Sequence, residues 1–228
     1  MKVLVACEYS GRVRDAFRSL GHDATSVDFL PTEVDGPHIQ GDVLEVLRNG
    51  GGWDMMIAHP PCTYLAASGL HWNKRVEGRA EKTEEALAFV RTLLGAPIPR
   101  IALENPVSCI STRIRKPDQI IQPWQFGHDA SKSTCLWLKG LHPLRPTKIV
   151  EPEFACCGTR FSHTLGKYGC PKCGAARGPA RQVFGNQTAS GQNRLSESPD
   201  RWKERSRTFE GIAAAMASQW GTVSCERR

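Results

Sequence analysis

A thiol and a carboxylate each follow a short apolar run in this chain. Cys62 closes the segment His59-Pro60-Pro61-Cys62, directly after the apolar residues 53–58, and Glu104 closes the run that starts at Ile101. Each proline fixes φ and removes a backbone donor, so strand pairing stops and the thiol is delivered to the rim of a sheet. In an open α/β sheet, ligands bind outside the carboxyl ends of the strands. The pattern predicts a nucleophilic thiol near an acid or hydrogen-bond donor.

Both side chains also have ordinary structural explanations. Free cysteine is among the most buried residue types, so Cys62 could be a core residue behind a strand. Glu104 could cap a helix or lie on the surface. The elements around them decide between these interpretations.

The first elements of the chain are typical of a nucleotide-type cofactor site. An apolar strand at 2–7 leads into the turn Glu8-Tyr9-Ser10-Gly11, an amphipathic helix at 13–20 and a second strand at 24–28 that ends in Asp28. The helix N-terminus would offer free amides, and the terminal acid could bond ribose hydroxyls. The turn has a single glycine, so an incidental turn is the alternative.

Later elements extend this α/β pattern. Asp42 would lie at the ligand edge of the sheet, or cap a helix at 43–47, or do both. Residues 63–79 read as a long polar loop that could close over a substrate. A helix at 81–94, a strand at 134–138 and an alanine-rich helix at 211–220 complete the predicted domain.

Cysteines cluster after Pro143, where the composition changes to Pro, Gly, Cys, Lys and Arg. Cys170 and Cys173 have the spacing of a zinc knuckle, in which two thiolates on a tight turn reach one tetrahedral ion. Cys156 and Cys157 are adjacent, and adjacent side chains usually point apart, so one of them, or His163, could be displaced from the site. The spacing favours structural Zn²⁺ over free thiols. The cations around the cluster could face phosphate or form a solvated basic surface: Arg160, Lys167, Lys172, Arg177 and Arg181.

The bulk properties set the class of protein. The 228 residues suffice for one α/β domain with a small appendage, and the formal charge of +7 suits a polyanionic partner. No apolar run approaches a membrane span and no secretory segment follows Met1, so we expect a cytoplasmic protein whose nine cysteines serve metal binding and catalysis. The expected domains are 1–142 completed by 208–221, then the zinc segment 143–207, with a tail at 222–228.

Five phrases together resemble the DNA cytosine-5 methyltransferases. They are Ser10-Gly11, Asp28, Gly41-Asp42-Val43, Pro60-Pro61-Cys62 and Glu104-Asn105-Pro106, and they occur in the family's order. The phrases His59-Pro60-Pro61-Cys62 and Ser218-Gln219-Trp220-Gly221 are similar to short phage-type members. The resemblance covers residues 1 to about 140 and the last helix.

The resemblance implies a Rossmann-like, S-adenosylmethionine-dependent methyltransferase fold with a zinc-binding insertion. It implies that Cys62 adds to cytosine C6 and that protonated Glu104 bonds N3 and the exocyclic amine, because C5 is too weak a nucleophile by itself. The implied partner is DNA, with the chain in a bacterial or phage-infected cell and a monomer favoured. The implied cofactor residues are Glu8, Tyr9, Ser10, Gly11, Asp28, Asp42 and Pro60, and the substrate residues Pro61, Asn105, Ser68, Lys132, Arg160 and Lys172.

The chain departs from the family at three places. Where the family has aromatic-x-Gly-x-Gly, this chain has the turn Glu8-Tyr9-Ser10-Gly11. The family's Gln-x-Arg-x-Arg signature is absent, and Lys132 is the one lysine or arginine in the matching stretch 128–134. The large target-recognition domain is also missing, and only 143–207 could take its place. Alternatives are the same chemistry on free dCMP or with a modified donor, and a catalytically silent DNA-binding module. An RNA cytosine methyltransferase and a dehydrogenase fit less well, since Cys62 follows Pro-Pro and no Gly-x-Gly-x-x-Gly follows the first strand.

Overall fold

The chain forms two compact units, each described by itself below. The computed structural model describes residues 1–157, 159–162, 170–173, 181–188, 193–195 and 197–222. The first unit comprises Met1–Ile121, Ser133–Arg145 and the chain from Ile212 onward, and the second comprises Gln122–Lys132 and Pro146–Gly211. No helix among the described residues is long and apolar enough to span a lipid bilayer.

A seven-stranded sheet forms the centre of the first unit, in the order β3-β2-β1-β4-β5-β7-β6. Its strands are β1 (Lys2–Ala6), β2 (Asp23–Asp28), β3 (His38–Gln40), β4 (Met55–Ala58), β5 (Arg100–Pro106), β6 (Gln119–Ile121) and β7 (Thr134–Lys139). Strands β1 to β5 are parallel, and β7 runs antiparallel to both β5 and β6. The predicted α/β class is confirmed. The strand order reverses between β1 and β4, where a parallel sheet opens a crevice for ligands.

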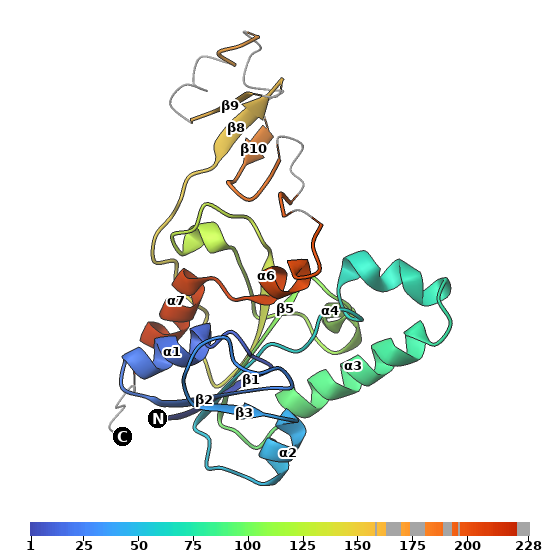
Figure 1. Ribbon diagram of the computed structural model, residues 1–228, viewed down its shortest axis with the longest axis vertical. Helices are drawn as coiled ribbons and strands as arrows, with labels where there is room; N and C mark the ends of the chain where they lie inside the picture. The colour runs from blue at the N-terminus through green and yellow to red at the C-terminus, as the bar shows by residue number, and fades with distance from the viewer. Residues whose placement is uncertain (158, 163–169, 174–180, 189–192, 196, 223–228) are drawn as a thin grey trace. The chain divides into compact units, whose positions relative to one another are not determined.

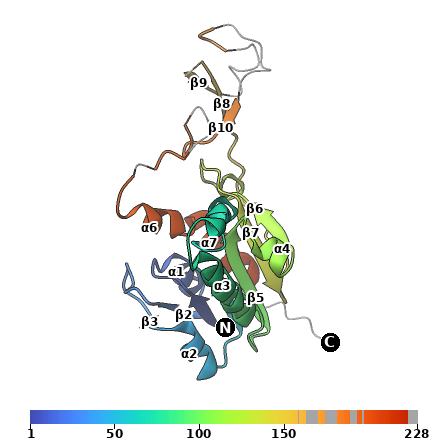
Figure 2. The ribbon, with the colours of Figure 1, turned by 90° about the vertical axis from the view of Figure 1, so that its right-hand side faces the viewer.

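Helices cover both faces of this sheet (Figures 1 and 2). They are α1 (Arg12–Ser19), α2 (Val43–Arg48), the 3₁₀ helix η1 (Ala67–Lys74), α3 (Arg79–Leu94), α4 (Ile110–Arg113) and α7 (Glu210–Trp220), whose first two residues belong to the second unit. Strand β4 and residues 3–6 of β1 are completely buried, which explains their continuous apolar sequences. Leu87, Val90 and Leu93 of α3 pack onto one face of the sheet.

The segment 63–79 is more regular than the sequence predicts. We expected an irregular polar loop, but η1 occupies its centre and α3 begins at its end. The Thr83 hydroxyl donates to the Tyr64 carbonyl at 3.0 Å, and Arg79 Nη2 donates to the Thr63 carbonyl at 2.9 Å. These bonds attach the segment to α3, and no periodicity in the sequence predicts them.

The second unit contains a three-stranded antiparallel sheet in the order β10-β8-β9. Its strands are β8 (Glu153–Cys156), β9 (Thr159–Phe161) and β10 (Arg181–Val183), and η2 (Pro123–Gln125) and α6 (Arg201–Ser206) accompany them. Phe154 lies opposite Phe161 in the register, and the two rings stack at 6.1 Å between centroids. This small core buries little apolar surface, so other bonds must order the unit.

Residues 122–132 join the second unit, whereas the expected division placed them in the catalytic domain. The Gly185 amide donates to Asp129 at 2.7 Å, the Ser131 amide to Asn186 at 2.9 Å, and the Gly211 amide to His128 at 2.8 Å. These partners are more than fifty residues away, so the sequence alone could not reveal them. The compact units therefore divide at 121/122, 132/133, 145/146 and 211/212 instead of at 142/143 and 207/208.

Arg14 is a fully buried arginine that ties α1 to the segment 26–35. Its guanidinium donates to Asp15, Ser26, Thr32 and the carbonyls of residues 34 and 35, at 2.7–3.3 Å. Gly11 and Gly36 both approach the guanidinium so closely that a Cβ on either would lie within 2.7 Å of Nη2. The contacts hold the chain that follows β2 over the start of α1.

We expect Arg14→Met to lower the free energy of unfolding by about 3 kcal/mol, because it leaves several buried acceptors without a donor. The matched control is Arg48→Met on α2, whose side chain is exposed and should change stability by about 0.5 kcal/mol or less. Urea denaturation of the full chain, followed by circular dichroism, measures both. Equal effects of the two substitutions would contradict a structural role for Arg14.

Candidate active site

Four ionisable side chains meet at the carboxyl edge of the parallel strands. Ala6 lies opposite both Val27 and Ala58 in the register, and Ala58 lies opposite Leu103. The residues just beyond these positions therefore reach the same edge of the sheet. They are Glu8 after β1, Asp28 at the end of β2, His59 after β4 and Glu104 in β5.

His59 and Glu104 form an ion pair at the centre of this edge. The distance from His59 Nδ1 to Glu104 Oε2 is 3.1 Å, and the two side chains are only 12% and 11% exposed. Glu104 is therefore neither a helix cap nor a surface acid, the alternatives that its sequence position allowed. Sequence reasoning assigned no role to His59. The position directly before Pro60, at the end of an apolar strand, is the signal that could have indicated one.

Asn105 joins the two strand ends that carry the pair. Its Nδ2 donates to the Pro60 carbonyl at 2.9 Å, and the side chain is 2% exposed. Two backbone bonds continue the connection, from the Ala67 amide to Val107 and from the Cys109 amide to Leu65. The loop that carries Cys62 is thus attached to the chain that follows β5. The Asn105 side chain is therefore turned away from solvent and holds the loop in place through its bond to the Pro60 carbonyl.

Cys62 lies exposed at the start of the turn after β4. Its carbonyl accepts the amides of Leu65 and Ala66, at 3.0 and 2.9 Å, so the turn closes behind it. The buried-core interpretation of Cys62 is wrong, because the two prolines and this turn direct it out of the sheet. Pro61 and Ser68 are also exposed, whereas Pro60 is buried.

A second thiol near this edge, Cys7, is chemically different from Cys62. It follows β1 with a left-handed backbone at φ 59°. Burial, and then the charges of Asp28 and Asp42, raise the pKa of Cys7 to about 12. Cys7 is therefore a neutral thiol near pH 7, and a poor nucleophile.

Glu8 occupies the amides at the N-terminus of α1. Its Oε1 accepts the Val13 amide at 2.7 Å and its Oε2 accepts the Arg14 amide at 3.1 Å, while the Ser10 hydroxyl donates to Oε1 at 3.3 Å. The expectation of free amides at this helix end is wrong, because a carboxylate that is 95% buried must find donors. Burial raises the pKa of Glu8, against the opposing effects of His59 and the two amides.

The remaining expected cofactor residues line the same edge. Asp28 is half-buried and accepts the Leu30 amide at 2.9 Å; burial raises its pKa. Phe29, next to it, is 73% exposed, an aromatic ring that sequence reasoning did not single out. Asp42 caps α2 by accepting the Leu44 amide at 2.9 Å, which confirms the predicted helix cap. Tyr9 and Ser10 are buried, and Gly11 has the left-handed backbone, at φ 72°, that glycine allows.

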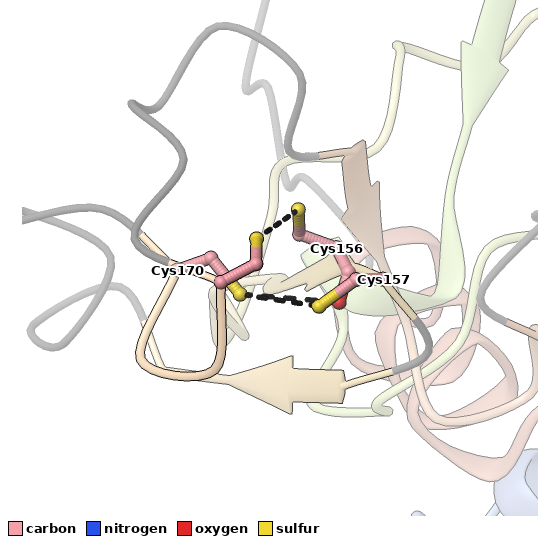
Figure 3. A group of neighbouring side chains, drawn as sticks. Cys156, Cys157 and Cys170 are labelled. Carbon is pink, nitrogen blue, oxygen red and sulfur yellow. Dashed lines mark hydrogen bonds between the residues drawn. The ribbon is translucent and has the colours of Figure 1, made fainter.

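Four cysteines of the second unit converge on one point. The thiols of Cys156, Cys157, Cys170 and Cys173 all lie within 4.8 Å of one another, and Figure 3 labels the first three. Cys156 Sγ lies 3.7 Å from Cys173 Sγ, and Cys157 Sγ 3.6 Å from Cys170 Sγ. Tetrahedral zinc with bonds of about 2.3 Å separates its sulfur ligands by about 3.8 Å.

The adjacent pair reaches this point because of an unusual backbone. Cys156 ends β8, and Cys157 has a left-handed conformation at φ 44°. This reverses the alternation of a strand, so the expected displacement of one of the two cysteines does not occur. His163 lies outside the described residues. Hydrogen bonds from the amides of Cys173 and Lys172 lower the pKa of Cys170 to about 7, whereas the hydrogen bond to Cys173 raises the pKa of Cys156 to about 12 and burial raises that of Cys157.

The basic residues that we expected to contact phosphate differ in the groups around them. Arg160 Nε donates to Glu153 at 2.7 Å, and Nη1 to the carbonyls of Phe184 and Gln187, so this guanidinium braces the second unit. Lys172 is exposed in the turn between Cys170 and Cys173. Lys132 Nζ donates to the Arg205 carbonyl at 2.8 Å. Lys167 and Arg177 lie outside the described residues.

Comparisons with known proteins give little support for a family. No protein-family model and no curated protein matches the chain. Among solved structures, one match is described as a "putative DNA modification methyltransferase encoded within prophage" of E. coli, with 14% sequence identity and a TM-score of 0.43. The match covers 75% of this chain, and the chain spans 56% of the length of that structure. A match at this level does not establish a shared activity.

We expect iodoacetamide at pH 8 to modify Cys62 at least about 100-fold faster than Cys7. Cys62 is exposed, whereas a thiol with a pKa of about 12 has only about 10⁻⁴ of its molecules as thiolate at pH 8. Time-resolved peptide mass spectrometry of the full chain gives both rates. Raising the pH to 10 should accelerate Cys7 about 100-fold. Similar rates for the two cysteines at pH 8 would contradict this description of the edge.

Proposed function

We propose that this chain transfers a methyl group from S-adenosylmethionine to C5 of cytosine in DNA. One observation carries the proposal. The exposed thiol Cys62 lies on a loop that is hydrogen-bonded to the strand end bearing Glu104, at the carboxyl edge of a mostly parallel sheet. A nucleophile and a buried carboxyl group at one edge are what addition to an unreactive pyrimidine ring requires.

Cys62 supplies the nucleophile in this reaction. Its thiolate adds to cytosine C6, the C5=C6 electron pair shifts into the ring, and N3 takes a proton from the Glu104 carboxyl group. The resulting neutral enamine is nucleophilic at C5, which receives the methyl group that S-adenosylmethionine supplies when bound. Loss of the C5 proton to a base or water then expels Cys62. The ring must leave the duplex stack to reach this edge.

The residues after β1 and β2 fit a nucleoside cofactor that lacks phosphates. A dinucleotide would place its pyrophosphate on the helix amides, but Glu8 already occupies those of Val13 and Arg14. Asp28 would accept from the ribose, with exposed Phe29 available to stack on adenine. Asp42 would accept from the adenine amine with an oxygen that does not cap α2. The remaining cofactor contacts would come from Tyr9, Ser10, Gly11 and Pro60.

The second unit would supply the contacts to DNA. We propose that Cys156, Cys157, Cys170 and Cys173 hold a structural Zn²⁺, since the small core around Phe154 and Phe161 buries little apolar surface. Lys172, which is exposed, and Lys132 would then face DNA, while Arg160 would keep its contacts within the second unit. In the first unit, the exposed Pro61 and Ser68 would contact the substrate, and Asn105 would position the loop that carries Cys62. A DNA-recognition unit of this size would contact a short target sequence.

The test is nucleoside mass spectrometry of DNA from cells that express the full chain. We expect 5-methylcytosine with the wild type and none with Cys62→Ala, while Cys109→Ala, which removes a buried thiol of the core, should retain it. A cytosine with another added mass would indicate a modified donor. No modified base in the wild-type sample would contradict the proposal, and favour free dCMP as substrate or a silent DNA-binding module.

We expect about one zinc ion per chain in protein purified without chelators, measured by plasma mass spectrometry. Cys170→Ser should lose the ion and the protease resistance of the second unit, because metal binding supplies folding energy there. Cys62→Ala is the matched control and should keep the ion, since this exposed thiol lies outside the cluster. A metal-free wild type with a protease-resistant second unit would contradict a structural zinc site.

A further inference from the structure

The ion pair of His59 and Glu104 is built into the sheet itself. Ala58 of β4 lies opposite Leu103 of β5, so His59 and Glu104 occupy the next positions along the same pair of strands. The His59 amide donates to the Ala6 carbonyl at 2.9 Å, and the next residue, Pro60, accepts the bond from Asn105. The backbone at His59 and Pro60 is thus held by hydrogen bonds, and the imidazole Nδ1 lies 3.1 Å from Glu104 Oε2.

Acidic groups face His59 from three neighbouring elements. Glu104 contacts it from β5, Glu8 acts on it from the turn after β1, and Asp28 from the end of β2. Each of these groups, when ionised, favours the imidazolium form of His59, whose side chain is 12% exposed, and Glu104 is in direct contact with it. Because the proton lies between Nδ1 and Oε2, imidazolium with carboxylate and imidazole with carboxylic acid carry the same number of protons.

We propose that His59 is the proton reservoir of Glu104. His59 supplies Glu104 with the proton that the carboxyl group gives to the substrate ring. The inference rests on the proposed function and deepens it. His59 touches Glu104 and not the base, so it is a positioning residue. Its role explains how Glu104 can give a proton to the ring at neutral pH, where an ordinary glutamate is ionised and has none to give.

The His59–Glu104 pair starts with one shared proton, as imidazolium and carboxylate. As the Cys62 thiolate bonds to C6, the C5=C6 electron pair becomes the C4=C5 bond, the C4=N3 pair moves onto N3, and N3 takes a proton from Glu104. The Nδ1–H bond of His59 breaks to supply that proton through Oε2, so neutral imidazole and carboxylate remain. When Cys62 leaves, N3 returns its proton to Glu104 and the pair regains its starting state.

The alternative is an ion pair with a purely structural role. Such pairs orient loops, and any donor of the right shape could replace the histidine. His59→Asn makes this distinction, because the asparagine amide nitrogen matches Nδ1 in position and can donate to Oε2, but it carries no proton that can be transferred. His142→Gln is the control, since His142 is exposed and contacts the Pro143 and Gln219 carbonyls.

The first measurement needs no activity. We would titrate the full chain, labelled in its histidine rings, by nuclear magnetic resonance, and assign His59 by the signal that His59→Asn loses. We expect the His59 midpoint to fall by about one pH unit or more in Glu104→Gln, because an adjacent carboxylate favours the imidazolium. Unchanged titration would overturn the proposal.

The second measurement follows covalent adduct formation against pH. The probe is a duplex of several kilobases in which every cytosine is 5-fluorocytosine, with S-adenosylmethionine; fluorine at C5 leaves no proton to remove, so Cys62 stays attached. At pH 7.5 we expect His59→Asn to form the adduct about 100-fold more slowly than the wild type, with recovery toward the wild-type rate at pH 5.5, where Glu104 takes its proton from solvent. His142→Gln should match the wild type throughout.

The outcomes separate this inference from the proposed function. If the wild type forms the adduct and His59→Asn forms it with the same pH profile, the reaction stands and the reservoir is wrong. If the wild type forms no adduct while His59 titrates together with Glu104, the proposed reaction is wrong and no substrate proton passes through the pair. A uniform loss of rate in His59→Asn at every pH would show a structural role and overturn the reservoir.

Discussion

The register between β4 and β5 is the constraint on which the candidate site depends. Because Ala58 lies opposite Leu103, the next residues of both strands form the His59–Glu104 pair, and Asn105 reaches the Pro60 carbonyl. A slip of one residue would turn each of these side chains to the other face of the sheet. The exposed position of Cys62 follows from the same register, since the loop starts where pairing ends at the two prolines.

Buried charge organises the rest of the edge. Glu8 and Arg14 are both withdrawn from water, and each is compensated by several hydrogen bonds: Glu8 by amides of α1, Arg14 by acceptors of the segment 26–35. These networks hold the turn after β1 and the chain after β2 in fixed positions. They also leave no helix amides for a pyrophosphate at Val13 and Arg14, which favours a cofactor without phosphates over a dinucleotide.

The second unit depends on a different kind of constraint. Its apolar core is small among the described residues, and hydrogen bonds join 122–132 to residues 185, 186, 205 and 211. Four thiols of the same unit converge. The left-handed backbone at Cys157 is what allows two adjacent cysteines to reach one point. Cysteine is seldom found with such a backbone, and ligation of an ion would repay its conformational cost.

The sequence by itself determined the α/β class, the strands at β1, β2, β4, β5 and β7, the cap at Asp42 and the cysteine pairs, because these follow from local periodicity, turn chemistry and spacing. It predicted that Cys62 and Glu104 reach one edge of the sheet, since each follows an apolar strand segment. Only the tertiary structure decided that His59 pairs with Glu104, that Glu8 fills the start of α1, and that 122–132 belongs with the second unit. These contacts join residues distant in sequence, or depend on where a buried charge finds donors, and no local pattern encodes them.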